Sequence, residues 1–272
     1  MRRAAGRLGA VGRLELLALV VAAALVVTVA ILPLFLTHGP LDLVDLPLKH
    51  PGGKHLLGTD EQGRDVFTRV VYGMRTSLWA AAVVIASGVV IGGVIGLVAG
   101  IAGGLIDTVL MRLTDLFLAL PGPLLVLAIV SALGPGLRNT LIGISVIWWP
   151  YYARIVRGQV RAIVALPHVE AARLGGLSRM RVALRHVLPG AWSPITVGAS
   201  LDVGNLVLLL AALSFLGLGS PEPAPELGAM TSLGLTYLFT GWWVAVAPAA
   251  GVFLLAFLGN LAGDAIRDLV GA

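Results

Sequence analysis

Six long stretches of the chain are apolar and almost free of charged side chains. They cover residues 16–36, 76–106, 116–137, 139–153, 190–220 and 227–263. A helix that crosses a bilayer needs roughly 20 apolar residues, and long arginine side chains at an end can lengthen a shorter run by reaching the interface. Asp202 is the one charged residue inside the six stretches. The pattern predicts an all-α integral membrane protein with six transmembrane helices.

Composition agrees with lipid as the solvent of most of the chain. Hydrophobic residues make up 58% of the sequence and charged residues 12%, against roughly 25% charged residues in a soluble domain. The mean hydropathy is +0.95. The net charge is +5, but the arginines stand between apolar runs rather than on one polar face, so we expect no nucleic-acid partner. With no cysteine, disulfides, thiol catalysis and cysteine-ligated metals are excluded.

The arginines predict the orientation. One cluster precedes the first apolar run, at residues 2, 3, 7 and 13, and a second covers residues 154–185, an even number of helices later. The positive-inside rule therefore places both clusters, and both termini, in the cytoplasm. The loop at 37–75 carries five basic residues and would lie outside, which agrees less well.

The chain divides accordingly into four segments. We expect a cytoplasmic tail at 1–15, a first transmembrane helix at 16–36, an external loop with a possible elbow helix at 37–75, and a five-helix core at 76–268 with a cytoplasmic loop at about 154–189. The first run with its arginines resembles a signal peptide, but it exceeds the roughly 7–15 apolar residues of such a segment, so we expect it to be retained, with cleavage as the alternative.

Small residues and prolines mark two of the spans. The second run places Gly88, Gly92, Gly93, Gly96 and Gly100 in helical stagger, which predicts a central helix that packs closely on its neighbours. The third run contains Pro121, Pro123 and Pro135, which a membrane helix tolerates when neighbours satisfy the freed carbonyls.

The fourth run is short and ends in aromatic and basic residues. Arg154 and Arg157 could reach the interface. The aromatic residues at 148–152 fit an interfacial belt, with substrate stacking as the alternative.

The cytoplasmic loop contains a recognisable motif. It reads Glu170-Ala171-Ala172, then Gly176, and later Leu188-Pro189. Strong helix formers followed by Gly176 predict a short helix that ends in a left-handed conformation, and a second amphipathic segment follows before the next span. Such a helical knob suits docking into a cleft on a soluble partner. The alternative is a basic loop that only anchors the topology.

This motif resembles the coupling loop of bacterial ABC importer permeases, although His186 stands where that motif usually has an aliphatic residue. The resemblance implies a type I importer permease fold with a cytoplasmic coupling helix that sits in a groove on an ATP-binding subunit. The residues that it implies for coupling to the ATPase are Glu170, Ala171, Ala172, Gly176, Leu188 and Pro189.

A second stretch narrows the resemblance. Residues 55–67 and 72–78 look like the external segment of dipeptide, oligopeptide and nickel permeases, in the subunit with the shorter external loop. Asp60, Arg64 and Asp65 could pair locally, with Asp65 and Arg69 as an i,i+4 pair. The functional interpretation is contact with a binding protein, or an elbow that braces the second helix; a solvated loop is the alternative. Where the family often has a glutamate before residues 213–219, this chain has Leu210.

Asp202 is a candidate for the substrate pathway because ionisable residues inside membrane spans are costly and often functional. It could contact the amino group of a peptide, pair with a partner subunit, or lie near the membrane edge in water.

The sequence gives little support for ATP hydrolysis, metal binding, proteolysis or secondary transport by this chain. A Walker A loop needs a lysine after a glycine-rich turn, and the only lysines are Lys49 and Lys54, so we expect no enzyme activity and no cofactor in this chain. The histidines at 38, 50 and 55 lack ligand-like spacing, so no metal site is expected. An intramembrane protease would need a catalytic pair at membrane depth. A secondary transporter would be expected to have paired broken helices in two inverted halves. We see neither pattern in the sequence.

We therefore expect a permease subunit of an ATP-driven peptide uptake system in the bacterial plasma membrane. The resemblance implies as partners a homologous permease in a heterodimer, two ATP-binding subunits that use ATP and Mg²⁺, an extracytoplasmic substrate-binding protein, and the lipid bilayer. A secondary transporter, or a permease for nickel chelates or other small solutes, is the alternative.

Overall fold

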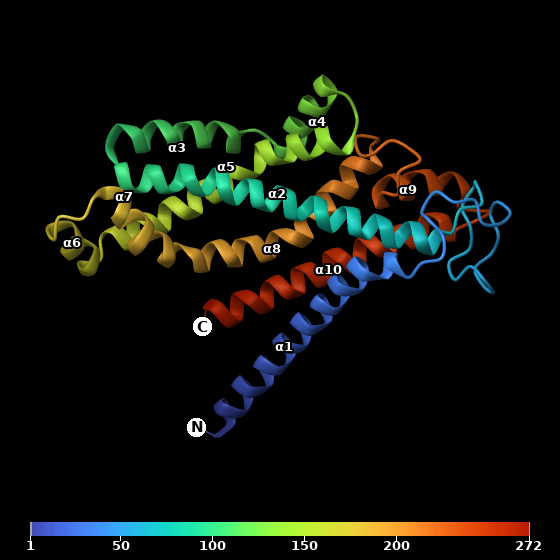
Figure 1. The fold of residues 1–272 in the computed structure, drawn as a ribbon, viewed down its shortest axis with the longest axis horizontal. Helices are drawn as coiled ribbons and strands as arrows, with labels where there is room; N and C mark the ends of the chain where they lie inside the picture. Colours follow the sequence, from blue (N-terminus) through green and yellow to red (C-terminus); the bar gives the residue numbers. More distant parts are fainter. Residues whose placement is uncertain (1, 272) are drawn as a thin grey trace. The chain divides into compact units, whose positions relative to one another are not determined.

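The computed structural model describes residues 2–271, with side chains described for 12–270 except those of 173, 179, 180 and 184. Helices make up most of this part of the chain, which confirms the all-α prediction (Figure 1). They are α1 (Arg2–Ile31), η1 (Leu32–Leu34), α2 (Val66–Ala102), α3 (Gly104–Ala119), α4 (Gly122–Leu133), α5 (Leu137–Val164), α6 (Pro167–Leu174), α7 (Arg179–Val182), the π-helical η2 (Ala183–Val187), α8 (Leu188–Phe215), α9 (Leu227–Gly234), η3 (Leu235–Tyr237) and α10 (Trp243–Gly271).

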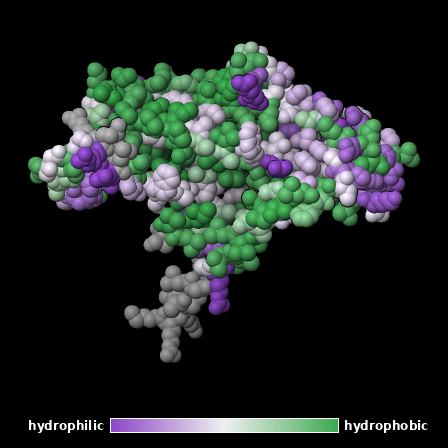
Figure 2. All heavy atoms as spheres, in the orientation of Figure 1, coloured by the Kyte–Doolittle hydropathy of each residue, from purple (hydrophilic) through white to green (hydrophobic). Residues whose placement is uncertain are grey.

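Four segments of the described residues are long and apolar enough to cross a membrane. They are Gly12–Leu34, Val66–Ala102, Arg185–Phe215 and Trp243–Val270, and the bent pair α3–α4 would make a fifth. Helix α5 has 28 residues and covers the fourth apolar run, but it is not among these segments. The expected six spans are compatible with this arrangement, and Figure 2 shows the apolar character of most of the visible helical surface.

Two element boundaries in this part of the chain differ from the sequence expectation. Helix α1 begins at Arg2, so the segment expected as a tail continues the first helix. The expected elbow helix is instead the first part of α2, because Asp65 accepts the Thr68 N–H at 2.8 Å and so starts the helix there. Val66 and Val70 then bury one face of the same continuous helix.

The third apolar run, residues 116–137, is interrupted, because it holds the last residues of α3, all of α4 and the first residue of α5. Helices α3 and α4 meet at 87° where Pro121 interrupts the chain. Because proline has no N–H, it cannot donate to the carbonyl four residues earlier. Asp107, which bounds the end of the second expected run, and Asp115, which bounds the start of the third, both lie inside α3.

The chain forms two compact units. Unit 1 holds Met1–Ala82, Leu127–Leu141 and Ser200–Ala272, and unit 2 holds Val83–Val126 and Ile142–Ala199.

A row of glycines packs α2 against α5 in unit 2. A Cβ atom on Gly92 would lie 2.3 Å from the carbonyl oxygen of Trp149, and one on Gly96 would lie 2.5 Å from that of Ala153. Gly88 and Gly100 also meet α5 side chains, whereas Gly93 has open space. The prediction of a closely packed glycine helix is confirmed, because only residues without a side chain allow the two backbones to approach this far.

Ion pairs join α3 to α5 in the same unit. Arg157 holds Asp107 through two hydrogen bonds, Nε to Oδ1 at 2.5 Å and Nη2 to Oδ2 at 2.7 Å. Arg161 approaches the same carboxylate at 3.5 Å, and Arg154 pairs with Asp115 at 2.6 Å. Acids on the neighbouring helix thus hold both side chains, and that Arg154 and Arg157 reach the interface stays a prediction.

In unit 1, α10 packs along α1 and α9. Small residues again bring α8 and α10 together, since a Cβ atom on Gly263 would lie 2.9 Å from Leu201 Cα. Gly204 likewise faces the Asn260 side chain of α10. Residues 37–65, which we call the cap, form a loop between α1 and α2, and Trp243 Nε1 at the start of α10 donates to the Thr59 carbonyl in the cap at 3.0 Å.

The glycine row generates a mutational prediction. We expect Gly96→Leu to separate α2 from α5, because overpacking of a close helix contact typically costs about 1–3 kcal/mol. The melting temperature of the purified protein should fall. The matched control is Gly93→Leu, which meets open space, and equal losses in the two variants would contradict the close contact.

Candidate functional site

Helix α6 carries the three residues of the Glu-Ala-Ala motif. It begins with Pro167, a position where the missing N–H costs nothing, and the Leu166 carbonyl accepts the N–H groups of Val169 and Glu170 at 3.0 and 3.2 Å. Glu170 lies in the first turn, where a negative charge is favourable next to the helix dipole.

The end of α6 has the conformation that the sequence predicts. Gly176 has φ +80°. The N–H of Gly175 reaches the Ala171 carbonyl at 2.9 Å, and that of Leu177 reaches the Ala172 carbonyl at 3.3 Å. A left-handed glycine with such bonds satisfies the last carbonyls and reverses the chain, so the expected termination at Gly176 is confirmed.

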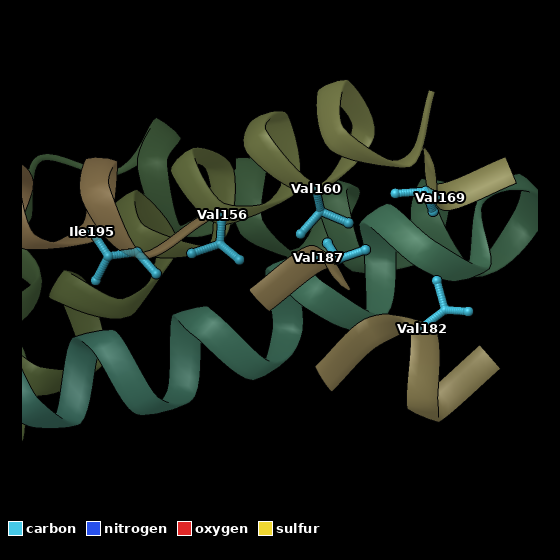
Figure 3. Close-up of a cluster of buried hydrophobic side chains, with 6 residues drawn as sticks. All are labelled: Val156, Val160, Val169, Val182, Val187 and Ile195. Carbon is cyan, nitrogen blue, oxygen red and sulfur yellow. The ribbon is translucent and has the colours of Figure 1, made fainter. Parts of the chain in front are cut away.

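A buried aliphatic cluster holds α6 to the helices behind it. Val169 of α6 is fully buried and lies with Val156 and Val160 of α5 (Figure 3). The other members are Val182, Val187 and Ile195, which lie in α7, η2 and α8. We call residues 165–187 the knob. Because the cluster joins five consecutive elements, we expect a displacement of α6 to be passed to α5 and α8 rather than absorbed in a loop.

The opposite side of α6 faces outward. Glu170 and Ala171 are exposed, and the Leu174 side chain is 84% exposed. Ala172 is partly buried against the aliphatic cluster. The exposed side chains of Leu174 and Ala171 form a small apolar surface on α6, which suits contact with another protein.

Leu188 and Pro189 lie apart from this outward side. They form the start of α8, directly after the π-helical turn in which the Leu188 N–H donates to the Ala183 carbonyl. Leu188 is half-buried and Pro189 is exposed. Within the motif, therefore, Glu170, Ala171 and Leu174 form the outward surface, and Leu188 and Pro189 lie at the base of the knob.

The cap encloses most of the other candidate residues. Asp60 and Arg64 are buried and pair at 2.5 Å, and Arg64 also reaches Glu61 at 2.8 Å. Arg69, at the start of α2, approaches Asp60 at 3.3 Å and donates to the carbonyls of Pro40 and Pro223 at 3.0 and 3.3 Å. The predicted Asp60–Arg64 pair is confirmed.

Asp65 has a different partner from the one expected. Its Oδ2 lies 2.8 Å from Nδ1 of the buried His55, whose other ring nitrogen lies 3.4 Å from Asp45. The expected Asp65–Arg69 ion pair is therefore wrong, because Arg69 turns to Asp60. Asp45 also pairs with Lys49, and that hydrogen bond holds the pKa of Asp45 below its ordinary value. A contact of Asp60, Arg64 and Asp65 with a binding protein stays a prediction.

Asp202 lies at the middle of α8, in unit 1, and is 7% exposed. Burial at the centre of a long apolar helix agrees with a functional acid, and its place in a pathway stays a prediction.

Glu226 is a buried acid that the sequence analysis did not single out. Its carboxylate accepts the N–H groups of Gly228 and Ala229 at 3.3 and 3.0 Å and so caps α9. Burial raises its pKa above the ordinary value. The signal in the sequence was an acid directly before an apolar helix, the typical position of an N-cap.

In the part of the chain whose side chains are described, no group of three or more histidine, aspartate or glutamate side chains is arranged so that it could hold a metal ion.

Comparison with known proteins agrees with this geometry. Residues 92–271 match the family described as "Binding-protein-dependent transport system inner membrane component". The "Probable D,D-dipeptide transport system permease protein DdpC" of Escherichia coli K12 is 40% identical over 240 residues, which cover 88% of this chain and 80% of that protein. The "Glutathione transport system permease protein GsiD" of Pectobacterium atrosepticum is 38% identical over 80% of this chain and 72% of that protein.

Solved structures show the same fold. One described as "Inward facing conformations of the MetNI methionine ABC transporter" aligns with a TM-score of 0.57 at 23% identity, covering 74% of this chain and 95% of that chain. The all-α fold is therefore that of ABC importer permeases, in a multi-pass membrane protein. On the match of residues 92–271 and the similarity to these permeases, the chain belongs to the family of inner membrane components of binding-protein-dependent transport systems.

Proposed function

We propose that the chain is one of two permease subunits of an ATP-driven importer for di- or oligopeptides. The observation that carries the proposal is the outward surface of α6, backed by a buried cluster that reaches the membrane helices. The names of the relatives support the substrate class, since permeases of D,D-dipeptide and dipeptide systems are 40% and 38% identical to this chain.

The partners follow from this role. A homologous permease would complete the translocation path as a heterodimer, two ATP-binding subunits would supply the energy, and an extracytoplasmic binding protein would deliver the peptide. ATP and Mg²⁺ would be bound by the ATPase subunits, with no cofactor in this chain. The arginine clusters favour cytoplasmic termini in a bacterial plasma membrane, and the knob would then lie on the side where ATP is available.

The mechanism rests on a rigid connection in unit 2. The glycine row fixes α5 to α2, the Arg157–Asp107 pair fixes α5 to α3, and the buried aliphatic cluster fixes α5 to α6. Packed interiors transmit displacements because they have few voids. When ATP closes the ATPase subunits, α6 moves with them, and α5 and α2 move as one body. ATP favours the conformation to which it binds more tightly.

The coupling role predicts the effect of a charge reversal on α6. We expect Glu170→Arg to lower ATP-dependent peptide uptake by about tenfold, a loss of roughly 1.4 kcal/mol in the knob's contact with the ATPase subunit. The exposed position of Glu170 should leave membrane insertion and the amount of complex unchanged. Radiolabelled dipeptide uptake and ATPase activity in proteoliposomes give the measurement.

The matched control for Glu170→Arg is Asp268→Arg, an exposed acid near the end of α10 outside the knob. Its surface ion pair with Arg267 is worth little, so uptake should stay near that of the unmodified protein. Equal uptake by the Glu170 and Asp268 variants would remove the coupling role from α6.

The pathway role predicts a second effect. If Asp202 faces the peptide's ammonium group, Asp202→Asn should raise the KM for dipeptide uptake because it removes a charge partner. Co-purification of the second permease should be unaffected. Unchanged KM values for both dipeptides and longer peptides would exclude Asp202 from the path, and loss of the second permease would assign it to subunit pairing.

A further inference from the structure

Helices α7 and α8 are joined without a loop. The π-helical turn η2 connects them, and the residues on either side of it, Val182 and Leu188, have right-handed helical dihedral angles. The chain is therefore helical from Arg179 to Phe215. In η2 the Leu188 N–H donates to the carbonyl of Ala183, five residues earlier rather than four. Such a turn accommodates one more residue than an α-helical turn, and π-turns inside α-helices occur frequently at functional sites.

This extra residue decides which side chains share a face. Val182 and Val187 are five residues apart, and a regular α-helix would place them about 140° apart around its axis. In a π-turn, residues five apart lie nearly above one another, because its hydrogen bonds span that interval. Val182 is 2% exposed and Val187 is fully buried, and both lie in the aliphatic cluster (Figure 3). The π-turn therefore brings both valines to the cluster.

The two valines hold opposite ends of the joint. Val182 belongs to the knob, where α7 packs against α6. Val187 begins a buried stripe that Ala191 and Ile195 continue along α8 at intervals of four residues. A Cβ atom on Gly190, just beyond η2, would lie 2.8 Å from a side-chain atom of α5. The start of α8 is thus closely packed, and such interiors pass on displacements because they have few voids.

We infer that the extra residue of η2 sets the rotation of α8 relative to the knob, and that Val182 and Val187 are the positioning residues through which a displacement of α6 reaches α8. The inference deepens the proposed function and rests on it. With both valines in one packed cluster, α8 follows the knob. With one valine turned away, α8 would lose its contact with α6, and ATP would be hydrolysed without the matching movement of α8.

Changes in the length of η2 test this relation. Deletion of Arg185, an exposed residue, leaves Val182 and Val187 four residues apart and about 40° apart in an α-helix, so the cluster should form without the π-turn. Insertion of one alanine after Arg185 leaves the valines six residues apart and about 120° apart. Arg185→Ala is the matched control, because it removes the same side chain and keeps the length.

The measurement is the number of peptides imported per ATP hydrolysed, in proteoliposomes that hold the complete transporter. We expect this ratio to stay within about twofold of the unmodified complex for Arg185→Ala and for the deletion, and to fall at least about tenfold for the insertion. A flexible linker would tolerate both changes of length, and a joint that only needs its native length would tolerate neither. Equal ratios for the deletion and the insertion, both high or both low, would therefore overturn the inference.

Val187→Ala keeps the length and serves where the insertion variant does not assemble. Because it shrinks the contact of α8 with the cluster, we expect the ratio to fall at least about threefold. The matched control is Val207→Ala, which removes the same atoms from a similarly buried valine of α8 outside the cluster. Both variants leave a cavity, so both melting temperatures should fall. Equal import ratios in these two variants would contradict the positioning role.

Peptide uptake by the unmodified complex separates the inference from the proposed function. Uptake by that complex, together with equal ratios for the deletion and the insertion, overturns the inference alone. ATP hydrolysis without peptide uptake by the unmodified complex overturns the proposed function, and with it the assignment of Val182 and Val187 to coupling.

Discussion

The close approach of α2 and α5 is the contact on which the rest of unit 2 depends. Gly92 and Gly96 put the two backbones so near that a single added Cβ atom would collide with a carbonyl oxygen. In lipid, where burial of apolar surface does not drive helices together, such van der Waals contact and interhelical polar bonds provide the association. Helix α5 is thereby held along its length, so the knob at its end is attached to a rigid element.

The charged residues show which parts of the fold can be predicted from the sequence and which cannot. The apolar runs predicted the helical membrane fold, and Gly176 predicted the end of α6, because both signals are local. The bounds of α3 were missed because Asp107 and Asp115 interrupt the hydropathy. Their partners Arg157 and Arg154 stand 50 and 39 residues further along the chain, and only the fold brings them together to neutralise the charges.

The cap shows the same limit for the candidate site residues. Asp60 and Arg64, four residues apart, could be paired from the sequence. The choice of Arg69 between Asp60 and Asp65 depends on His55, which occupies Asp65, and on the carbonyls of Pro40 and Pro223. The break between α3 and α4 shows the same limit of the sequence. Prolines indicate where a helix can be interrupted, but the 87° angle between α3 and α4 depends on how α5 packs against them.

A disulfide across α2 and α5 tests the rigid-body account most directly. Ser87 and Ser145 share a hydrogen bond between their hydroxyl groups at 2.9 Å, so Ser87→Cys with Ser145→Cys in this cysteine-free chain would place two thiols in bonding range. Because the two helices move together, peptide uptake by the oxidised complex should match uptake by the reduced complex. Loss of uptake on oxidation, with recovery after reduction, would show that α2 and α5 slide past each other and would contradict the account.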